Sequence, residues 1–377
     1  MTGLEFSHGI WNSPGGYYTY QYAGGGGGGS ASAGAPGGQG GNGTTSGGGS
    51  GGAGSGAGGG GGHFAVGQNG SFPGGGDGGA SGAAGGNGAS GQIVITYTPV
   101  YCGNVVWSAS GGGSWGTLTT NFGTNWGGVG YGSPGLNPSF PDIATLGNSV
   151  ASGTVAVTLD GATPYLAALT FSNSNASYTL AAGSGGTVHL NGGAAGAALT
   201  DSAGSHAITA PVALDTSTVA TVTNLGDTLA ISGPISGSGG LTTSGAGTLV
   251  ISGPGAVNGG VTTTGAGTLV ISSAVAVNGG ITTTGAGTVL ISGAINGEVT
   301  TSGAGTALIS GAISGSDGVT VAGPGALVLT AGNSYIGGTT ISAGTLQLGN
   351  GGTTGTVLGG ITNNGTLKVP HPKATLD

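Results

Sequence analysis

The groups best suited to catalysis lie in one short segment near the middle of this 377-residue chain. Asp201, Ser202, Ser205 and His206 supply a carboxylate, two hydroxyls and an imidazole, which are the groups of a nucleophilic hydrolase. A catalytic triad is a spatial arrangement, however, and neighbouring residues of one turn rarely aim at a single reacting atom. We therefore interpret the segment as a polar loop and assign no catalytic residue.

Paired carboxylates that hydrolyse glycosidic bonds would have to come from a small set of aspartates. The five in question are Asp142, Asp160, Asp201, Asp215 and Asp227. Their spacing follows no repeat, so no pair stands out from the others. A polysaccharide-active enzyme therefore stays an alternative to a protein without enzymatic activity.

Metal and cofactor sites lack the residues they need. Asp77 lies in the sequence Gly-Gly-Gly-Asp-Gly-Gly, but a calcium-binding glycine repeat requires recurring aspartates and this stretch has one. Cys102 is the single cysteine, which excludes an internal disulfide and a multi-cysteine metal site. We predict no metal ion and no other cofactor.

Charge excludes further classes of function. The chain has two lysines, Lys368 and Lys373, no arginine and ten acidic residues, which give a net charge of -8. Phosphate recognition needs clustered Lys or Arg, so we predict no nucleic-acid partner. Glycine accounts for 98 residues and charged residues for 3% of the chain, against roughly 7% and roughly 25% in ordinary globular proteins.

Hydropathy places limits on membrane insertion. No run of about 18 apolar residues occurs, so we predict no membrane-spanning segment. Residues 1–30 contain no Lys or Arg and no apolar core of a signal peptide, so an export signal is not visible in this chain.

Four zones follow one another along the chain. Residues 1–100 form a glycine-rich, low-complexity segment framed by strand-like stretches at 17–22 and 92–97, which could pair with each other. Its interior is interpreted as a flexible spacer, with a bundle of extended glycine helices as the alternative. Residues 101–150 are a Trp-rich cap or linker, residues 151–370 a β-solenoid and residues 371–377 a tail.

The second zone holds three of the four tryptophans, Trp107, Trp115 and Trp126. Aromatic rings in a chain this poor in them either close the end of a repetitive β-structure or present a binding face. A cap would cover apolar rungs and unpaired backbone groups. A carbohydrate-stacking platform would use the same amphipathic rings as a surface, so the three tryptophans are candidate surface-binding residues.

The third zone contains an internal repeat. The sequence LTTSGAGTLVIS at 241–252 recurs with small changes from residues 261 and 281, then after a step of 18 from residue 299 and after a further 20 from residue 319. Short β-branched runs with a period near 20 are typical of a solenoid, in which each coil buries its apolar positions only against its neighbours. We expect Leu249, Leu269 and Val289 to stack inside, with glycines such as Gly245 and Gly265 at the corners.

Three asparagines recur at the ends of successive repeats. Asn258, Asn278 and Asn296 are predicted to form a structural ladder of stacked amides, and a polar binding row is the alternative. Residues 228–297 contain no charged side chain. A charge repeated in register would face its own copy about 5 Å away, so stacking explains this absence.

Threonines recur at the start of each repeat. The triplets 262–264 and 282–284 would give ladders of methyl and hydroxyl groups, and Thr263 and Thr283 are candidate surface-binding residues for ice or a crystalline glycan. The simpler interpretation is that threonine suits a solvated β-surface.

One stretch resembles a known family. Residues 323–349, GPGALVLTAGNSYIGGTTISAGTLQLG, closely resemble the autotransporter-associated β-strand repeat, and related copies cover about 239–350. Residues 107–238 look like the region that precedes such repeats in large bacterial surface proteins. The resemblance implies an all-β, right-handed parallel β-helix, with one coil of about 20 residues for each repeat. It also implies that the chain is exported and displayed or released as an adhesin or surface scaffold.

These observations together predict a non-enzymatic extracellular structural or adhesive protein. It would be a β-solenoid surface scaffold or fibre subunit, located outside the cell or on its outer surface. Its partners would be further copies of itself, in a homo-oligomer or filament, or a cell-surface or glycan ligand. The alternatives are a polysaccharide-active β-helix enzyme and a glycan- or ice-binding module that uses the threonine ladders or the Trp zone.

Overall fold

The computed structural model describes residues 19–23, 92–96, 104–116, 125–128, 133–351 and 354–370. They fall into two units, residues 1–100 and residues 101–377. In the first unit, β1 (Thr19–Ala23) pairs in antiparallel register with β2 (Gln92–Thr96), which confirms the pairing predicted for the two strand-like stretches. Asp77, Cys102 and Lys373 lie outside the described residues.

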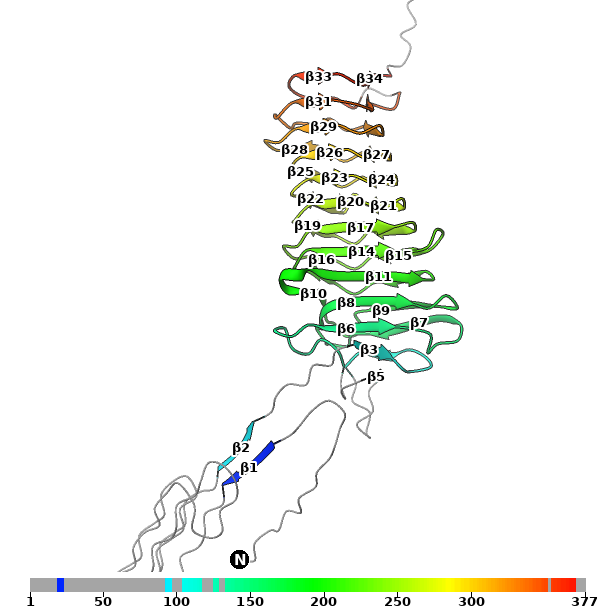
Figure 1. Cartoon of the computed structure of the whole chain (residues 1–377), viewed down its shortest axis with the longest axis vertical. Coiled ribbons are helices and arrows are strands. Elements are labelled where there is room, and N and C mark those ends of the chain that lie inside the picture. Colours follow the sequence, from blue (N-terminus) through cyan, green and yellow to red (C-terminus); the bar gives the residue numbers. More distant parts are fainter. Residues whose placement is uncertain are drawn as a thin grey trace, which may run out of the picture. The chain divides into compact units, whose positions relative to one another are not determined.

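The second unit is a parallel β-solenoid of about 11 turns of ~21 residues (Figure 1). Each regular coil contributes one strand to each of three stacks, which we call faces A, B and C. Strands β17, β18 and β19 lie in this order in one coil, and β20 then returns to face A above β17. The all-β solenoid is confirmed, and so is the coil length predicted from the repeat.

Faces A and B run through most of the solenoid and share the same number of strands. Face A consists of β3 (Asn104–Trp107), β6 (Asp142–Leu146), β8 (Tyr165–Ser172), β11 (Ala197–Ala203), β14 (Thr218–Val222), β17 (Leu241–Gly245), β20 (Val261–Thr263), β23 (Ile281–Thr283), β26 (Val299–Thr301), β29 (Val319–Val321), β31 (Thr339–Ile341) and β33 (Ile361–Asn363). Face B consists of β4 (Gly113–Ser114), β7 (Gly153–Thr158), β9 (Ala176–Ala181), β12 (His206–Ile208), β15 (Thr228–Ile231), β18 (Thr248–Ile251), β21 (Thr268–Ile271), β24 (Thr288–Ile291), β27 (Thr306–Ile309), β30 (Ala326–Leu329), β32 (Thr345–Leu348) and β34 (Thr366–Lys368).

Face C is shorter than the other two. It consists of β10 (Val188–Leu190), β13 (Val212–Leu214), β16 (Ile235–Ser236), β19 (Gly255–Val257), β22 (Val275–Asn278), β25 (Ile295–Asn296) and β28 (Ile313–Ser314). At its N-terminal end, the first residues of the long strand β8 pair with β10, while the rest of β8 pairs with β11 of face A. The 3-10 helix η1 (Gly193–Ala195) joins β10 to β11, and β5 (Trp126–Gly128) pairs antiparallel with β3. No helix in the described part of the chain is long and apolar enough to cross a membrane.

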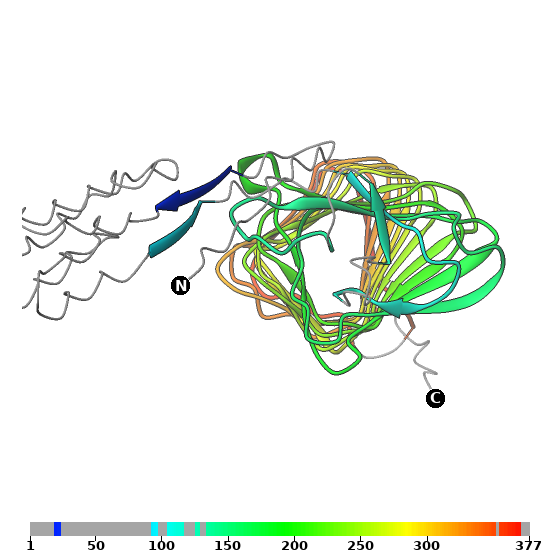
Figure 2. The same ribbon diagram turned by 90° about the horizontal axis from the view of Figure 1, so that it is seen from below.

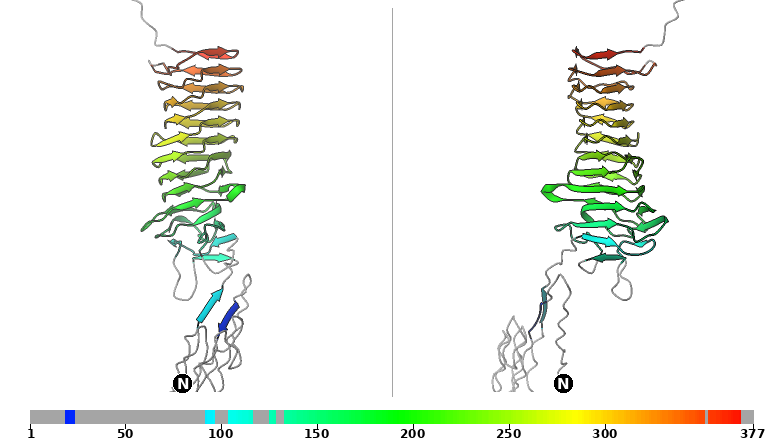
Figure 3. Two further views of the ribbon diagram at one scale, coloured as in Figure 1. Left: turned by 90° about the vertical axis from the view of Figure 1, so that its left-hand side faces the viewer. Right: turned by 45° about the vertical axis from the view of Figure 1, so that its right-hand side comes forward.

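The core is a set of apolar columns that run along the solenoid axis. Leu249, Leu269 and Val289 pair in register and are buried, while Val250 between Leu249 and Ile251 points outward, as strand alternation predicts. The coils surround a common axis when the solenoid is viewed end on (Figure 2), and they stack as layers from the side (Figure 3). Every inward-facing apolar side chain of an internal coil is therefore covered by the coils before and after it.

The corners between faces A and B are glycines because neighbouring backbones approach closely there. A Cβ at Gly265, Gly285 or Gly303 would run into the carbonyl oxygen of the equivalent glycine one coil earlier. Gly245 also has a φ of 89°, a region that only glycine enters without cost. The recurrent glycines follow from these contacts at each corner.

Coil length varies although the strands stay in register. Val261, Ile281, Val299 and Val319 pair in succession along face A, and the step from Ile281 to Val299 is two residues shorter than the steps on either side. In this short coil the two residues are missing at the corner between faces B and C, since Ile291 precedes Ile295 by four residues and Ile271 precedes Val277, the partner of Ile295, by six. The corner absorbs the difference and leaves faces A and B unchanged.

Candidate functional site

The three tryptophans of the N-terminal coils form a buried cluster. Trp107 and Trp115 are 0% exposed and Trp126 is 5% exposed. The ring of Trp126 lies edge-on to both others, with centroids 5.2 Å from Trp107 and 4.4 Å from Trp115. Aromatic pairs prefer this geometry inside a core. The prediction that these side chains offer a binding surface is therefore wrong, because no ring face is open to a ligand.

The polar edge of each indole is also occupied. The Nε1–H of Trp107 donates to the carbonyl oxygen of Gly111, that of Trp115 to Pro134, and that of Trp126 to Trp115, at 3.0–3.1 Å. A buried indole needs such a partner. The cluster thus belongs to the core of the first coils, where it packs against the start of the apolar columns.

Thr263 and Thr283 lie inside the solenoid. Their side chains are 7% and 8% exposed, and they stack on each other in register. Because Val261 and Ile281 point inward, the residue two positions later must do the same. The prediction of a binding surface at Thr263 and Thr283 is therefore wrong. The outward-facing threonines are the preceding residues, Thr262 and Thr282.

A small cavity lies behind the inward threonines at the corner of faces A and B. It has a volume of about 20 Å³ and is lined by Thr243, Thr263, Thr268, Thr288, the corner glycines and apolar side chains such as Leu269. A space of this size holds one water molecule. It is too small for an organic ligand.

The asparagine ladder forms in part. The side-chain amide of Asn278 donates to Oδ1 of Asn258 at 2.9 Å, and that of Asn258 donates to the carbonyl oxygen of Gly237. Asn296 stands opposite Asn278 in the register of β22 and β25. The amides at 258 and 278 therefore bond from coil to coil on face C.

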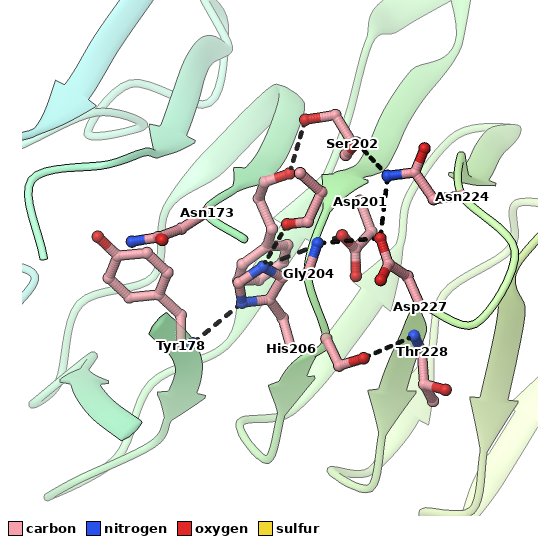
Figure 4. A network of polar contacts seen from close by, with 12 residues as sticks. Asn173, Tyr178, Asp201, Ser202, Gly204, His206, Asn224, Asp227 and Thr228 are labelled. Carbon is pink, nitrogen blue, oxygen red and sulfur yellow. Dashed lines mark hydrogen bonds and ion pairs between the residues drawn. The ribbon is translucent and has the colours of Figure 1, made fainter. Parts of the chain in front are cut away.

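The one cluster of buried ionisable groups in the described residues is centred on Asp201 and His206 (Figure 4). Asp201 is the fifth residue of β11 and occupies an inward position of face A, stacked between Phe171 and Val222. It is 0% exposed, and neither carboxylate oxygen has a hydrogen-bond partner in the described part of the chain. An acid here replaces an apolar residue of the core column.

His206 is held in one neutral form. Its Nδ1 accepts the backbone N–H of Tyr178 at 3.0 Å, and Nε2 lies 2.9 Å from the carbonyl oxygen of Ala203, to which it can only donate. The ring stacks on Phe171 with centroids 5.0 Å apart. Burial lowers the pKa of His206, because the imidazolium would lose its hydration.

The pKa of Asp201 is shifted in the opposite direction to that of His206. Burial, reinforced by the negative charge of Asp227, raises the pKa of Asp201 to about 7. Its Oδ1 lies 4.0 Å from Nε2 of His206, which is too far for a hydrogen bond. Asp227 itself accepts the backbone N–H of Gly204 at 2.9 Å and the side-chain amide of Asn224 at 3.0 Å.

The hydroxyls of this segment do not complete a hydrolytic site. The Ser202 hydroxyl donates to the carbonyl oxygen of Phe171, and the Ser205 hydroxyl accepts the backbone N–H of Thr228. Neither serine bonds to His206, so the base has no nucleophile. A substrate cannot reach the buried carboxyl either.

The remaining aspartates are dispersed. Asp142 is buried and accepts the backbone N–H of Gly135, while Asp160 is exposed and bonds to the Thr158 hydroxyl, which lowers the pKa of Asp160. The described residues contain no group of three or more His, Cys, Asp or Glu side chains that could hold a metal ion.

Sequence reasoning missed one polar cluster on face C. The Nδ1 atom of His189 lies 2.9 Å from Oδ2 of Asp215, and Tyr165 stacks on the imidazole with ring centroids 4.3 Å apart. The three residues come from successive coils and are brought together by the register of β8, β10 and β13. Each follows the previous one by slightly more than one coil length, and this spacing is the signal that could have found them.

Comparisons with known proteins place one part of the chain. Residues 319–348, which cover β29, β30, β31 and β32, match the passenger-associated-transport-repeat family. A 33-residue segment is 67% identical to the "Adhesin BmaC autotransporter" of Brucella suis biovar 1 (strain 1330), and it covers 9% of this chain and 1% of that adhesin. No solved structure matches the chain significantly.

Proposed function

We propose that this chain, an autotransporter-associated β-repeat protein, works as a non-enzymatic adhesive rod on the outer surface of a bacterial cell. The observation that carries the proposal is the passenger repeat at 319–348, which lies inside a continuous stack of coils. The relative that matches part of the chain is an autotransporter adhesin by name. A rod of this kind acts through the side chains on its outer faces, because its interior is filled.

The distribution of reactive groups supports the same proposal. Asp201 and His206 are enclosed in the core, and the tryptophans are buried. What remains outside is long, regular and nearly uncharged, which suits contact with an extended surface better than conversion of a small substrate. The adhesion target is therefore expected to be a surface with many equivalent positions.

Adhesion of protein-coated beads tests the proposal. Beads that carry the full chain should be retained under flow on bacterial or host-cell surfaces, and beads that carry Asp201→Asn should be retained equally, because Asp201 is enclosed. Intact producing cells should also lose antibody labelling of the chain after brief protease treatment. Labelling only after the cells are opened, or turnover of a glycan panel that Asp201→Asn abolishes, would contradict the proposal.

Self-association is a second candidate function, and the outward column of face B favours it. Val250, Val270, Leu290, Leu308 and Val328 pair in register and are half-buried on the outer surface. Such an aliphatic stripe can pack against the same stripe of an antiparallel second copy, with no opposing charge between residues 228 and 297.

Sedimentation at increasing concentration tests this second candidate. The wild-type chain should form dimers or longer assemblies, whereas Val270→Lys/Leu290→Lys should sediment as a monomer, because stacked ammonium groups repel the partner. The double variant Thr262→Lys/Thr282→Lys, which changes face A in the same two coils, is the matched control. Association that survives the face B substitutions, or a monomeric wild type, would contradict it.

A further inference from the structure

Face A presents hydroxyl groups in a two-dimensional array. An outward column, A1, consists of threonines that pair in register from strand to strand: Thr242, Thr262, Thr282, Thr300, Thr320, Thr340 and Thr362. A second outward column, A2, lies two residues later in each coil: Ser244, Thr264, Thr284, Ser302, Ala322, Ser342 and Asn364. All of these side chains are half-buried or exposed.

The array has fixed spacings in both directions. Neighbours within a column are about 4.8 Å apart, and the two columns are separated by roughly 7 Å, the distance of two residues along a strand. Threonine is β-branched, so its χ1 angle is restricted before any ligand arrives. The hydroxyls and methyls of column A1 are therefore held in place at little further entropic cost.

Most hydroxyls of column A1 are available to an outside partner. Those of Thr242, Thr262, Thr282, Thr320 and Thr340 have no hydrogen-bond partner within the described part of the chain. Thr300 is the exception, since it donates to Oε1 of Glu298 at 2.7 Å.

Column A2 is anchored to the backbone. The Thr264 hydroxyl donates to the carbonyl oxygen of Thr243, and the Thr284 hydroxyl donates to that of Thr263, each at 3.1 Å. The two side chains thereby keep one orientation, with their methyl groups also fixed.

Column A1 keeps its residue type where neighbouring columns change. The inward column beside it runs from Thr283 through Thr301 to Val321 and Ile341. The outward column of face B runs from Val250 to Gln347 and Lys368 over the same coils. A solvated β-strand accepts many residue types, so the general demands of a β-surface do not account for seven threonines in succession.

A ligand that uses the whole array must repeat at the same spacings. The outward positions of β17, β20, β23, β26 and β29 contain no aromatic or charged side chain. Aromatic and charged side chains are the groups that proteins commonly use to bind sugars. Hexagonal ice, by contrast, is an uncharged lattice of hydrogen-bonding oxygens whose shortest repeat is close to the strand spacing. Ordered water can bond to each hydroxyl and to its own neighbours at once.

We propose that face A between β17 and β31 is an ice-binding surface that orders water over columns A1 and A2. This function goes beyond the adhesive role and does not rest on it, since ice activity and adhesion of beads are measured separately. The polar column supplies hydrogen bonds to the lattice, and the methyl groups between the hydroxyls exclude disordered water. The activity should require the flat array rather than any single residue.

Ice growth in the presence of the full chain tests the proposal. The wild-type protein should shape single ice crystals and separate their melting and freezing temperatures. Thr262→Tyr/Thr282→Tyr should reduce both effects to the level of buffer, because two large rings raise the ligand off the array. Tyrosine is accepted in strands, so this variant should fold, and its circular dichroism and thermal unfolding should match those of the wild type.

A matched control lies on the other face of the same coils. Thr268 and Thr288 pair in register at outward positions of face B, and Thr268→Tyr/Thr288→Tyr should keep full ice activity. An inactive wild type, equal loss in both double variants, or activity that survives the face A substitutions would overturn the proposal. Binding of the wild type to crystalline cellulose, lost only in the face A variant and without any effect on ice, would overturn it in favour of a polysaccharide ligand.

Discussion

The coils before residue 228 and the coils after it solve the same packing problem in different ways. The early coils contain the tryptophan cluster, both described histidines and five aspartates, and their strands reach eight residues in β8. From residue 228 to residue 334 the chain has no aromatic residue and no histidine, and short strands of two to five residues repeat. The early coils are held by contacts that occur once, and the later coils by contacts that recur in columns.

The difference shows how specificity is divided along the rod. A contact that occurs once, such as the edge-on packing of Trp126 between two other indoles, defines a single arrangement of the chain. A contact that recurs in every coil stabilises the whole stack but is satisfied equally well by the coil before or after. The early coils can therefore define the register that the later coils propagate.

The largest effect is expected from a corner glycine of the regular coils. Gly285→Val should destabilise the solenoid by more than about 4 kcal/mol, because its Cβ would meet the carbonyl oxygen of Gly265 and the backbone cannot move without displacing a whole coil. Urea unfolding measures the change. Gly111→Ala, in the early coils with open space around it, should be nearly neutral. Equal stability of both variants would contradict the conclusion that close backbone contacts require glycine at the corners.

Removal of one ring of the tryptophan cluster is the corresponding change in the early coils. Trp107→Ala should cost about 3–5 kcal/mol, since a fully buried ring leaves a cavity. Hydrogen exchange should show whether the loss remains in the first coils. Unprotected amides confined to residues before 150 would indicate that the later coils hold their register alone, contrary to the division described above.

Asp201 is expected to be a residue whose removal stabilises the protein. Its folded-state pKa of about 7 exceeds the unfolded value of 3.8, so the native state binds an extra proton between these pH values and the wild type loses stability as pH rises through this window. Asp201→Asn should therefore be more stable at pH 8, by up to about 4 kcal/mol, because one pKa unit corresponds to about 1.4 kcal/mol.

The neighbouring histidine acts with the opposite sign. The lowered pKa of His206 means that the unfolded state binds more protons below pH 6.5, so this group makes the wild type more stable as pH rises toward that value. Both proteins contain His206, so the difference in their free energies of unfolding reports the contribution of Asp201 alone. Urea unfolding at pH 5, 7 and 8 measures this difference. A difference that does not grow with pH would show that Asp201 is ionised in the fold.

The smallest effect is expected at the asparagine ladder. Asn278→Ala should cost about 1 kcal/mol, the usual net value of one partly exposed hydrogen bond, here the 2.9 Å contact with Asn258. Thermal unfolding detects a change of this size. A loss several times larger would mean that the amides act cooperatively along the column, and that the later coils depend on polar as well as apolar stacking.

The regular coils could be predicted from the sequence in some detail. The period of the repeat placed Leu249, Leu269 and Val289 in one buried column, because in a parallel stack the repeat in sequence is the repeat in space. The same reasoning erred at Thr263 and Thr283, where the choice of middle residue in each triplet ignored the inward positions already fixed at Val261 and Ile281.

The early coils could be predicted only in outline. Asp201 looks like a loop residue by composition, yet it ends up in a core column opposite Phe171, and nothing in the local sequence indicates this. The cluster of Tyr165, His189 and Asp215 is likewise formed by register alone. Contacts that occur once leave no period behind, so they become visible only when the coils are assembled.

The short coil between Ile281 and Val299 has a consequence for errors in assembly. The coils that begin at 241 and 261 are nearly interchangeable, and a growing rod could pair one in place of the other without exposing an apolar side chain of the core. The shortened corner between Ile291 and Ile295 cannot be matched by a segment that is two residues longer. A slip among the equivalent coils would place a segment of the wrong length against this corner. The mismatch would stop the slip at this coil and keep it out of the coils that follow.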